Sequence, residues 1–255
     1  MAVLDKFRLS GGKAFVTGGS QGIGKSVAIG LAEAGADVAI VARGLPKAEE
    51  AAHQIARLGV KTIAVKADVT VPEQVDSMMK SILKAFGTVD VAFNNAGTAV
   101  VEKAEDMTYE NLTRVINVNI FGLFLTAQAA ARVMIANKKG SIINMASMSA
   151  HVVNVPQQTA NYNASKAGVV QLTKCLAVEW AAHGVRVNSI SPGYTRTELA
   201  ESFSEALINQ WVEKIPLKRM ARPDEMQGVV LFLASDASSY CTGTDIVIDG
   251  GYTLW

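Results

Sequence analysis

The sequence predicts a single doubly wound α/β domain, in which a parallel sheet of about seven strands carries helices on both faces. Short apolar runs rich in β-branched residues recur along the chain, and helical patterns lie between them. The early runs start about 25 residues apart, which suits strand–helix–strand crossovers better than hairpins. No Pro/Gly/Ser-rich linker or shift in composition divides the 255 residues, so we expect one domain over 1–255.

The expected strands are uniformly apolar rather than alternating, which is typical of a sheet that is buried on both faces. They lie at residues 13–17, 37–42, 62–66, 89–93, 141–145, 185–190 and 245–248.

The clearest helical patterns are 25–34 and 72–86, each with an apolar stripe and each closed by a glycine. The widest interval without a strand runs from about 190 to 244. We expect it to hold a helical insertion near 197–217 that covers a binding site, because a long connection without function would be unusual.

Charge and composition exclude several kinds of partner. Lys+Arg 24 against Asp+Glu 23 leave a net charge of +1, so no basic excess indicates nucleic acid and no polybasic cluster indicates a membrane surface. The amino terminus lacks the apolar core of a signal peptide, and the most apolar stretch, 115–136, carries too many polar groups to span a membrane. Two cysteines and three histidines without ligand spacing predict no metal site. We expect a cytoplasmic protein that acts on a small molecule.

A glycine-rich turn, Thr17-Gly-Gly-Ser-Gln-Gly-Ile-Gly24, follows the first strand directly and precedes a helix. Gly18 permits the tight turn, Gly22 lets the backbone approach a pyrophosphate, and Gly24 lets the helix pack on the strand. The helix N-terminus supplies N–H donors and a partial positive charge. This context predicts a dinucleotide site in a Rossmann-type sheet.

Further motifs follow in a fixed order along nearly the whole chain. They are Asn94-Asn-Ala-Gly97, Asn117-Val-Asn119, Ser147, Tyr162-Asn-Ala-Ser-Lys166, Pro192-Gly193 and Asp249-Gly-Gly251. Together with the TGxxxGxG spacing of the turn, they resemble the short-chain dehydrogenase/reductase family. The resemblance implies hydride transfer between a nicotinamide cofactor and an alcohol or carbonyl carbon.

Tyr162 and Lys166 are four residues apart, which places both on one face of a helix. A tyrosine with its usual pKa of about 10 is a poor base at neutral pH, but a nearby ammonium favours the phenolate. The pair can therefore exchange a proton with a carbinol oxygen. By the resemblance, Lys166 also hydrogen-bonds the nicotinamide ribose.

Two more residues complete the expected catalytic set of Asn119, Ser147, Tyr162 and Lys166. Ser147 follows the fifth strand and matches the family's substrate-orienting serine. It lies 15 residues before Tyr162, two more than is usual, so Ser149 stays the alternative or a substrate contact. Asn119 interrupts an apolar helical run, where asparagine can divert backbone bonding. The resemblance assigns its backbone to a water that links Lys166 to solvent.

The expected cofactor is NADP(H), with NAD(H) as the alternative. Arg43 lies 19 residues after Gly24, near the place, about 20 residues on, where an acid would bind the ribose of NAD. A guanidinium there can pair with a 2′-phosphate, although Gln21 is not the second basic residue of many NADP-dependent members. By the resemblance, the other cofactor contacts are Ser20, Ile23, Asp68, Val69, Asn95, Ala96, Gly97, Pro192, Gly193, Thr195 and Thr197.

Within the family, four local strings resemble the polyol dehydrogenase/ketose reductase branch of mannitol-, sorbitol- and galactitol-type enzymes. They are 145–149, 154–157, 188–194 and 249–252. Ser149, His151, Asn154 and Gln157 would add hydrogen-bonding groups to the cleft beside Ser147, as a sugar or polyol requires.

Two other functions remain open. One is reduction of a 3-oxoacyl-(acyl carrier protein) or another carbonyl, and the other is a non-catalytic nucleotide-binding sensor or scaffold. The resemblance further implies a homotetramer, and the apolar run 246–248 with Tyr252 and Trp255 would suit a subunit contact.

Overall fold

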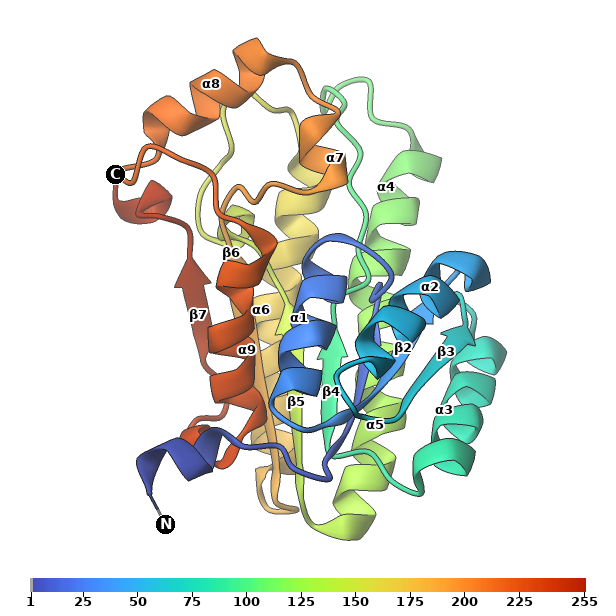
Figure 1. The fold of residues 1–255 in the computed structure, drawn as a ribbon. Coiled ribbons are helices and arrows are strands. Elements are labelled where there is room, and N and C mark those ends of the chain that lie inside the picture. The colour runs from blue at the N-terminus through green and yellow to red at the C-terminus, as the bar shows by residue number, and fades with distance from the viewer. Residues whose placement is uncertain (1) are drawn as a thin grey trace.

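The computed structural model describes residues 2–255, which contain a seven-stranded, all-parallel sheet with the order β3-β2-β1-β4-β5-β6-β7 (Figure 1). The strands are β1 (Lys13–Thr17), β2 (Asp37–Ala42), β3 (Thr62–Lys66), β4 (Val91–Asn94), β5 (Gly140–Met145), β6 (Val185–Pro192) and β7 (Asp245–Ile248). The predicted doubly wound α/β sheet is confirmed.

Helices cover both faces of the sheet. The main ones are α1 (Gly22–Glu33), α2 (Leu45–Ala56), α3 (Pro72–Phe86), α4 (Tyr109–Ile116), α5 (Leu123–Asn137), α6 (Ala160–Ala181), α7 (Glu198–Glu201), α8 (Glu205–Lys214) and α9 (Gln227–Ala234). Apolar side chains of α1, α2 and α9 pack on one face, and those of α3, α5 and α6 pack on the other.

Successive residues in the middle of the inner strands are apolar because both faces of the sheet are buried. In β1, Ala14 and Val16 join the core under α1, whereas Phe15, between them, joins the core under α3 and α5. Four predicted strands have the predicted bounds, but β4 begins at Val91 instead of residue 89. The carboxylate of Asp90 accepts the N–H of Lys13 at 2.8 Å, so this residue ends the loop before the strand.

Residues 109–137 form one helical segment in three parts, α4, a π-helical turn (Asn117–Gly122) and α5. It has 29 residues, and its most apolar 18-residue stretch has a mean hydropathy of 1.5, so by length and composition it could cross a membrane. Half of its most apolar stretch is buried, however, and Ala127, Ala130 and Met134 pack into the core beneath the sheet. It is a core helix.

Helices α7 and α8 lie over the carboxyl ends of the strands, in an excursion of the chain that leaves and returns at one point (Figure 1). Thr195 and Ala221 form a parallel bridge. On either side of it, Arg196 donates its N–H to the Ala221 carbonyl at 2.8 Å, and Ala221 donates to the Tyr194 carbonyl at 2.9 Å. The two ends of the excursion are thus fixed to each other.

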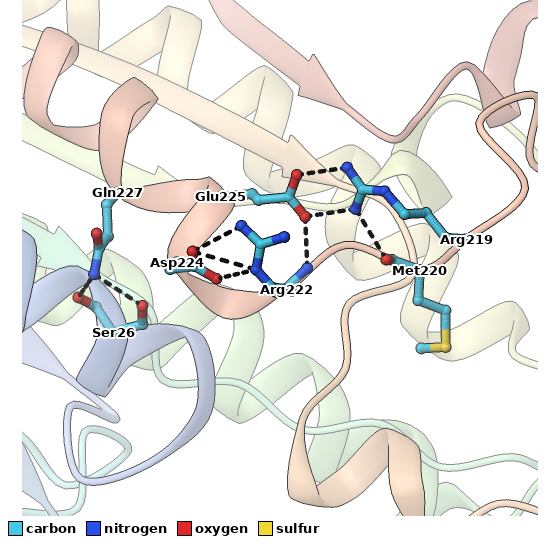
Figure 2. A network of polar contacts seen from close by, with 7 residues as sticks. All are labelled: Ser26, Arg219, Met220, Arg222, Asp224, Glu225 and Gln227. Carbon is cyan, nitrogen blue, oxygen red and sulfur yellow. Dashed lines mark hydrogen bonds and ion pairs between the residues drawn. The ribbon is translucent and has the colours of Figure 1, made fainter.

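Charged side chains hold the segment that follows this bridge (Figure 2). The Arg219 guanidinium donates to both carboxylate oxygens of Glu225, at 2.6 and 2.7 Å, and Glu225 also accepts the N–H of Arg222 at 2.8 Å. One turn on, the Gln227 amide donates to the carbonyl and the hydroxyl of Ser26 in α1. The excursion is therefore anchored to the helix that follows the glycine-rich turn.

We predict that Glu225→Gln lowers the melting temperature at neutral pH. The Arg219 guanidinium and the Arg222 N–H hold the pKa of Glu225 at about 2, below its usual 4.5. The carboxylate therefore stabilises the fold above its usual pKa, and this stabilisation is lost as the pH falls through the folded value. Thermal unfolding should show the gap between wild type and variant narrowing from neutral pH to pH of about 3.

Asp224→Asn is the matched control, because Asp224 pairs only with Arg222 two residues away and both side chains are largely exposed. Its effect should be the smaller one. Equal shifts for the two variants would show that the Arg219–Glu225 pair does not anchor the segment.

Candidate active site

A cavity of about 630 Å³ opens at the carboxyl ends of the strands. It lies at the boundary between β1 and β4, where the strand order reverses. Open α/β sheets bind their ligands at this point. Apart from His151, every residue that the sequence predicts to contact cofactor or substrate lines it. Asn119 is the one member of the predicted catalytic set that does not, because it is fully buried beside the cavity.

The loops after β1 and β4 are clamped together at the base of the cavity. The Thr17 hydroxyl accepts the N–H groups of Asn95 and Ala96, both at 3.0 Å. In return, the Asn95 side-chain amide donates to the carbonyls of Thr17 and Gly18, at 3.0 and 3.2 Å. The glycine-rich turn therefore has a fixed shape without any ligand.

That shape leaves a cradle with a helix N-terminus at its end. Gly18 has φ +62°, a conformation that favours glycine, and a Cβ at Gly24 would collide with the Gly18 carbonyl. Gln21 precedes α1 and makes no side-chain capping bond, so its first N–H groups remain available. These features fit the pyrophosphate of a dinucleotide.

Two cations lie at the outer end of the same cavity. Arg43 follows β2, and Lys47 stands in the first turn of α2 with its Nζ 3.5 Å from Oε1 of Gln21. Burial opposes ionisation of Asp68, but hydrogen bonds from Thr70 and the charge of Arg43 keep the pKa of Asp68 below its usual value. Sequence reasoning missed Lys47, although Pro46 at the start of α2 is a signal that places position 47 in a first helical turn.

Helix α6 brings Tyr162 and Lys166 to the inner part of the cavity. The Lys166 ammonium lies 5.6 Å from the centre of the Tyr162 ring and donates to the Met145 carbonyl at 2.7 Å. Lys166 is 3% exposed, and this burial lowers its pKa to about 8. Burial also raises the pKa of Tyr162, while a hydrogen bond with Ser147 works against that rise. Lys166 therefore loses its proton more readily than a lysine in water, and Tyr162 loses its proton less readily than a tyrosine in water.

Ser147 lies two residues after the end of β5 and caps a short 3₁₀ turn (Met148–Ala150). Its hydroxyl accepts the N–H of Ser149 and donates to the Ser149 hydroxyl, both at 3.1 Å. Ser147 is the serine that hydrogen-bonds to Tyr162. Ser149 also lines the cavity, and its hydroxyl accepts from Ser147.

Asn119 stands in the π-helical turn, where the helical backbone bonding is diverted as its position in the apolar run predicts. Its Oδ1 accepts the N–H of Thr98 at 2.8 Å, and its Nδ2 donates to the Thr98 carbonyl and the Ser165 hydroxyl, both at 2.9 Å. A Cβ built on Gly97 would lie within 4 Å of both Asn119 Oδ1 and Lys166 Nζ. Asn119 therefore ties the loop after β4 to α6 next to the lysine.

Two expectations from the sequence are wrong. His151 is not part of the cavity lining, and its Nε2 lies 2.7 Å from the carboxylate of Asp245, which also accepts the hydroxyls of Ser189 and Ser191. Tyr252 is 7% exposed and packs within the chain, so it does not offer a subunit contact as Trp255, 79% exposed, still does. Over residues 2–255, no three His, Cys, Asp or Glu side chains are grouped so that they could hold a metal ion.

Known proteins are similar to this chain over nearly its whole length. A family model described as enoyl-(acyl carrier protein) reductase matches residues 18–253. The sorbose reductase SOU1 of Candida albicans is 43% identical over 98% of this chain and 90% of its own. The NADP-dependent mannitol dehydrogenase of Alternaria alternata is 41% identical over 98% of this chain and 95% of its own. A solved short-chain type dehydrogenase/reductase from Mycobacterium marinum is 51% identical and superposes over both full chains with a TM-score of 0.96.

Proposed function

Because the chain belongs to the short-chain dehydrogenase/reductase family, we propose that it is an NADP(H)-dependent oxidoreductase that interconverts a ketose and its polyol. One observation carries the proposal. Ser147, Tyr162 and Lys166 meet in the same cavity that the glycine-rich turn lines. A substrate bound there has its oxygen against proton-donating groups and its carbon toward the cofactor.

The substrate class is supported by the relatives and by the cavity. Two relatives that match over almost the whole chain are named a sorbose reductase and a mannitol dehydrogenase. The cavity wall beyond Ser147 includes the polar side chains of Ser149, Asn154 and Gln157. Such groups suit a polyhydroxylated molecule, whereas a steroid or long acyl chain would require an apolar wall.

The preference for NADP(H) rests on Arg43 and Lys47. Both line the cavity at the end of β2, where a 2′-phosphate would lie. A planar guanidinium and an ammonium together provide charge-assisted hydrogen bonds for a dianionic group. When bound, the cofactor supplies or accepts the hydride at nicotinamide C4.

In the direction of reduction, Ser147 donates a hydrogen bond to the substrate carbonyl oxygen and orients it. Tyr162 gives that oxygen its proton, and because burial raises the pKa of Tyr162, the phenol is protonated at neutral pH. The Lys166 ammonium stabilises the phenolate that results. Asn119 holds the loop beside Lys166 and so maintains the position of the ammonium. Oxidation of the polyol uses the same groups in reverse.

A second candidate activity is reduction of the ketone of a 3-oxoacyl-(acyl carrier protein), because the matching family model is described as enoyl-(acyl carrier protein) reductase, which also acts on a carrier-bound acyl chain. We further propose a cytoplasmic homotetramer. Leu254 and Trp255, 78% and 79% exposed, with Val247 on the edge strand β7, give the carboxyl end an apolar surface that suits a subunit contact.

We predict that the enzyme oxidises NADPH with fructose, sorbose, xylulose or ribulose at a higher kcat/KM than with an acetoacetyl thioester. Tyr162→Phe should lower kcat by about 10²- to 10⁴-fold, because it removes the proton donor, and leave the Kd for NADPH unchanged. Steady-state kinetics and fluorescence titration measure the two quantities. Full turnover by the variant would rule out the mechanism, and inactivity of the wild type on every carbonyl would favour a sensor or scaffold.

Arg43→Ala and Lys47→Ala should each raise KM for NADPH by about 10- to 100-fold and leave KM for NADH nearly unchanged, since each removes a charge-assisted hydrogen bond to the 2′-phosphate. Arg57→Ala, at the far end of α2 and outside the cavity, is the control. Equal losses with NADPH and NADH would mean that these cations do not recognise the phosphate.

The pKa of Lys166, lowered to about 8, predicts the pH profile of reduction. Above that pH the ammonium loses its proton and no longer stabilises the Tyr162 phenolate, so kcat/KM should fall as the pH rises through about 8. Lys166→Arg keeps its charge, and although its absolute rate should be lower, its descending limb should move to higher pH. The same limb in both proteins would assign the ionisation to another group.

A further inference from the structure

A chain of polar side chains runs from the catalytic helix α6 to the far wall of the cavity. Asn163 is oriented by Thr159, whose hydroxyl donates to its Oδ1 at 2.9 Å, and its Nδ2 then donates to Oδ1 of Asn154 at 3.3 Å. The Asn154 Nδ2 donates to the Tyr194 hydroxyl at 3.5 Å. The Tyr194 hydroxyl in turn donates to Oε1 of Gln157 at 2.5 Å.

Each hydrogen bond in this chain donates toward Gln157, and this donor-to-acceptor order fixes the orientation of the Gln157 side-chain amide. Because Tyr194 already accepts from Asn154, its own proton must find an acceptor, and Gln157 provides one only with Oε1 turned toward the tyrosine. No hydrogen bond between the described residues uses the Gln157 Nε2. Gln157 lines the cavity, so it has two N–H donors available there in a set orientation.

Aromatic packing holds Tyr194 in place. Its ring stacks on Trp211 of α8 with centroids 4.3 Å apart and 6° between the planes, and Tyr252 meets it edge-on at 5.4 Å. Trp211 is 2% exposed, and its indole N–H has no hydrogen-bond partner among the described residues, so its position there rests on packing. Burial raises the pKa of Tyr194, which keeps the hydroxyl protonated and able to donate.

The chemistry of this wall indicates what it recognises. Asn154, Gln157, Tyr194 and Trp211 all line the cavity and all are neutral. A carboxylate would call for a cation, whereas two amide N–H donors suit the lone pairs of a hydroxyl group. A hydroxyl left without these donors, or donors left without a hydroxyl, loses binding energy.

We propose that Gln157 binds a hydroxyl group of the substrate that is remote from the reacting carbon, and that Tyr194 is the positioning residue that fixes the Gln157 amide. This inference rests on the proposed ketose or polyol substrate. It makes Gln157 a determinant of specificity for polyhydroxylated molecules over simple ketones.

The test compares Gln157→Leu and Tyr194→Phe with the wild type, with Gln158→Leu as the matched control because Gln158 is exposed and lies outside the cavity lining. Three quantities are measured: kcat and KM for sorbose and fructose, kcat and KM for a ketone without hydroxyl groups such as cyclohexanone, and the Ki of a hexitol against cyclohexanone reduction in the presence of NADPH.

We expect both site variants to raise the ketose KM and the hexitol Ki by about 5- to 10-fold, the loss of one hydrogen bond, with kcat and the cyclohexanone KM within about 2-fold of wild type. The double variant should be no worse than Gln157→Leu alone, because Tyr194 acts through Gln157. Gln158→Leu should match wild type.

The outcomes separate this inference from the proposed function. Ketose turnover with unchanged KM and Ki in both variants overturns the role of Gln157 and leaves the function standing. A wild type that reduces cyclohexanone but no ketose overturns the function, while a hexitol Ki that depends on Gln157 still supports the inference. If the wild type shows neither ketose turnover nor inhibition by the hexitol, both the function and the inference are overturned. If the variants lose as much activity with cyclohexanone as with the ketoses, the effect is a general structural one, and the inference is overturned.

Discussion

The two-way clamp between Thr17 and the loop after β4 is the constraint on which the rest of the site depends. It joins the two central strands of the sheet at the point where the chain order reverses, using one hydroxyl and one side-chain amide. By fixing Asn95 and Ala96 it also sets the start of the segment that continues to Gly97 and Thr98. The Asn119 side chain hydrogen-bonds to Thr98 of that segment and to Ser165 of α6. The glycine-rich turn and α6 are thus linked through these hydrogen bonds and the backbone of residues 95–98.

Burial then gives the catalytic groups their chemistry. The Lys166 ammonium has lost most of its water, and its one protein partner is a carbonyl at the end of β5. The desolvated ammonium releases its proton more easily, because burial lowers the pKa of Lys166 to about 8, and the desolvated phenol holds its proton more firmly, because burial raises the pKa of Tyr162. At neutral pH both groups are therefore protonated, which suits the proposed donation of a proton from Tyr162 beside a cation that stabilises the phenolate.

Much of this arrangement could be predicted from the sequence, and the exceptions have physical reasons. Apolar strands and glycine-closed helices are local signals, so the seven strands were predicted, four of them with their observed bounds, and so was α3. The residues of the glycine-rich turn and the Tyr162–Lys166 pair could also be predicted, because they are identified by their spacing within one element, and the sequence shows that spacing. Lys47 and the Asp245 partner of His151 depend on which elements meet in space, and this cannot be inferred from local spacing. The short helix α9 was missed because it is apolar on all sides and shows no stripe.

The bridge between Thr195 and Ala221 has a consequence for how the protein can vary. The bridge closes the excursion at its base, and Glu225 and Gln227 anchor the segment that follows Ala221. The residues between Thr195 and Ala221 therefore form a cassette with fixed ends. The entropic penalty for a longer or shorter cassette grows only slowly with its length. Replacing it would change what covers the bound molecule while the sheet and the proton-transfer groups stay where they are. The cover of the cavity and the groups beneath it thus lie in separable parts of the chain.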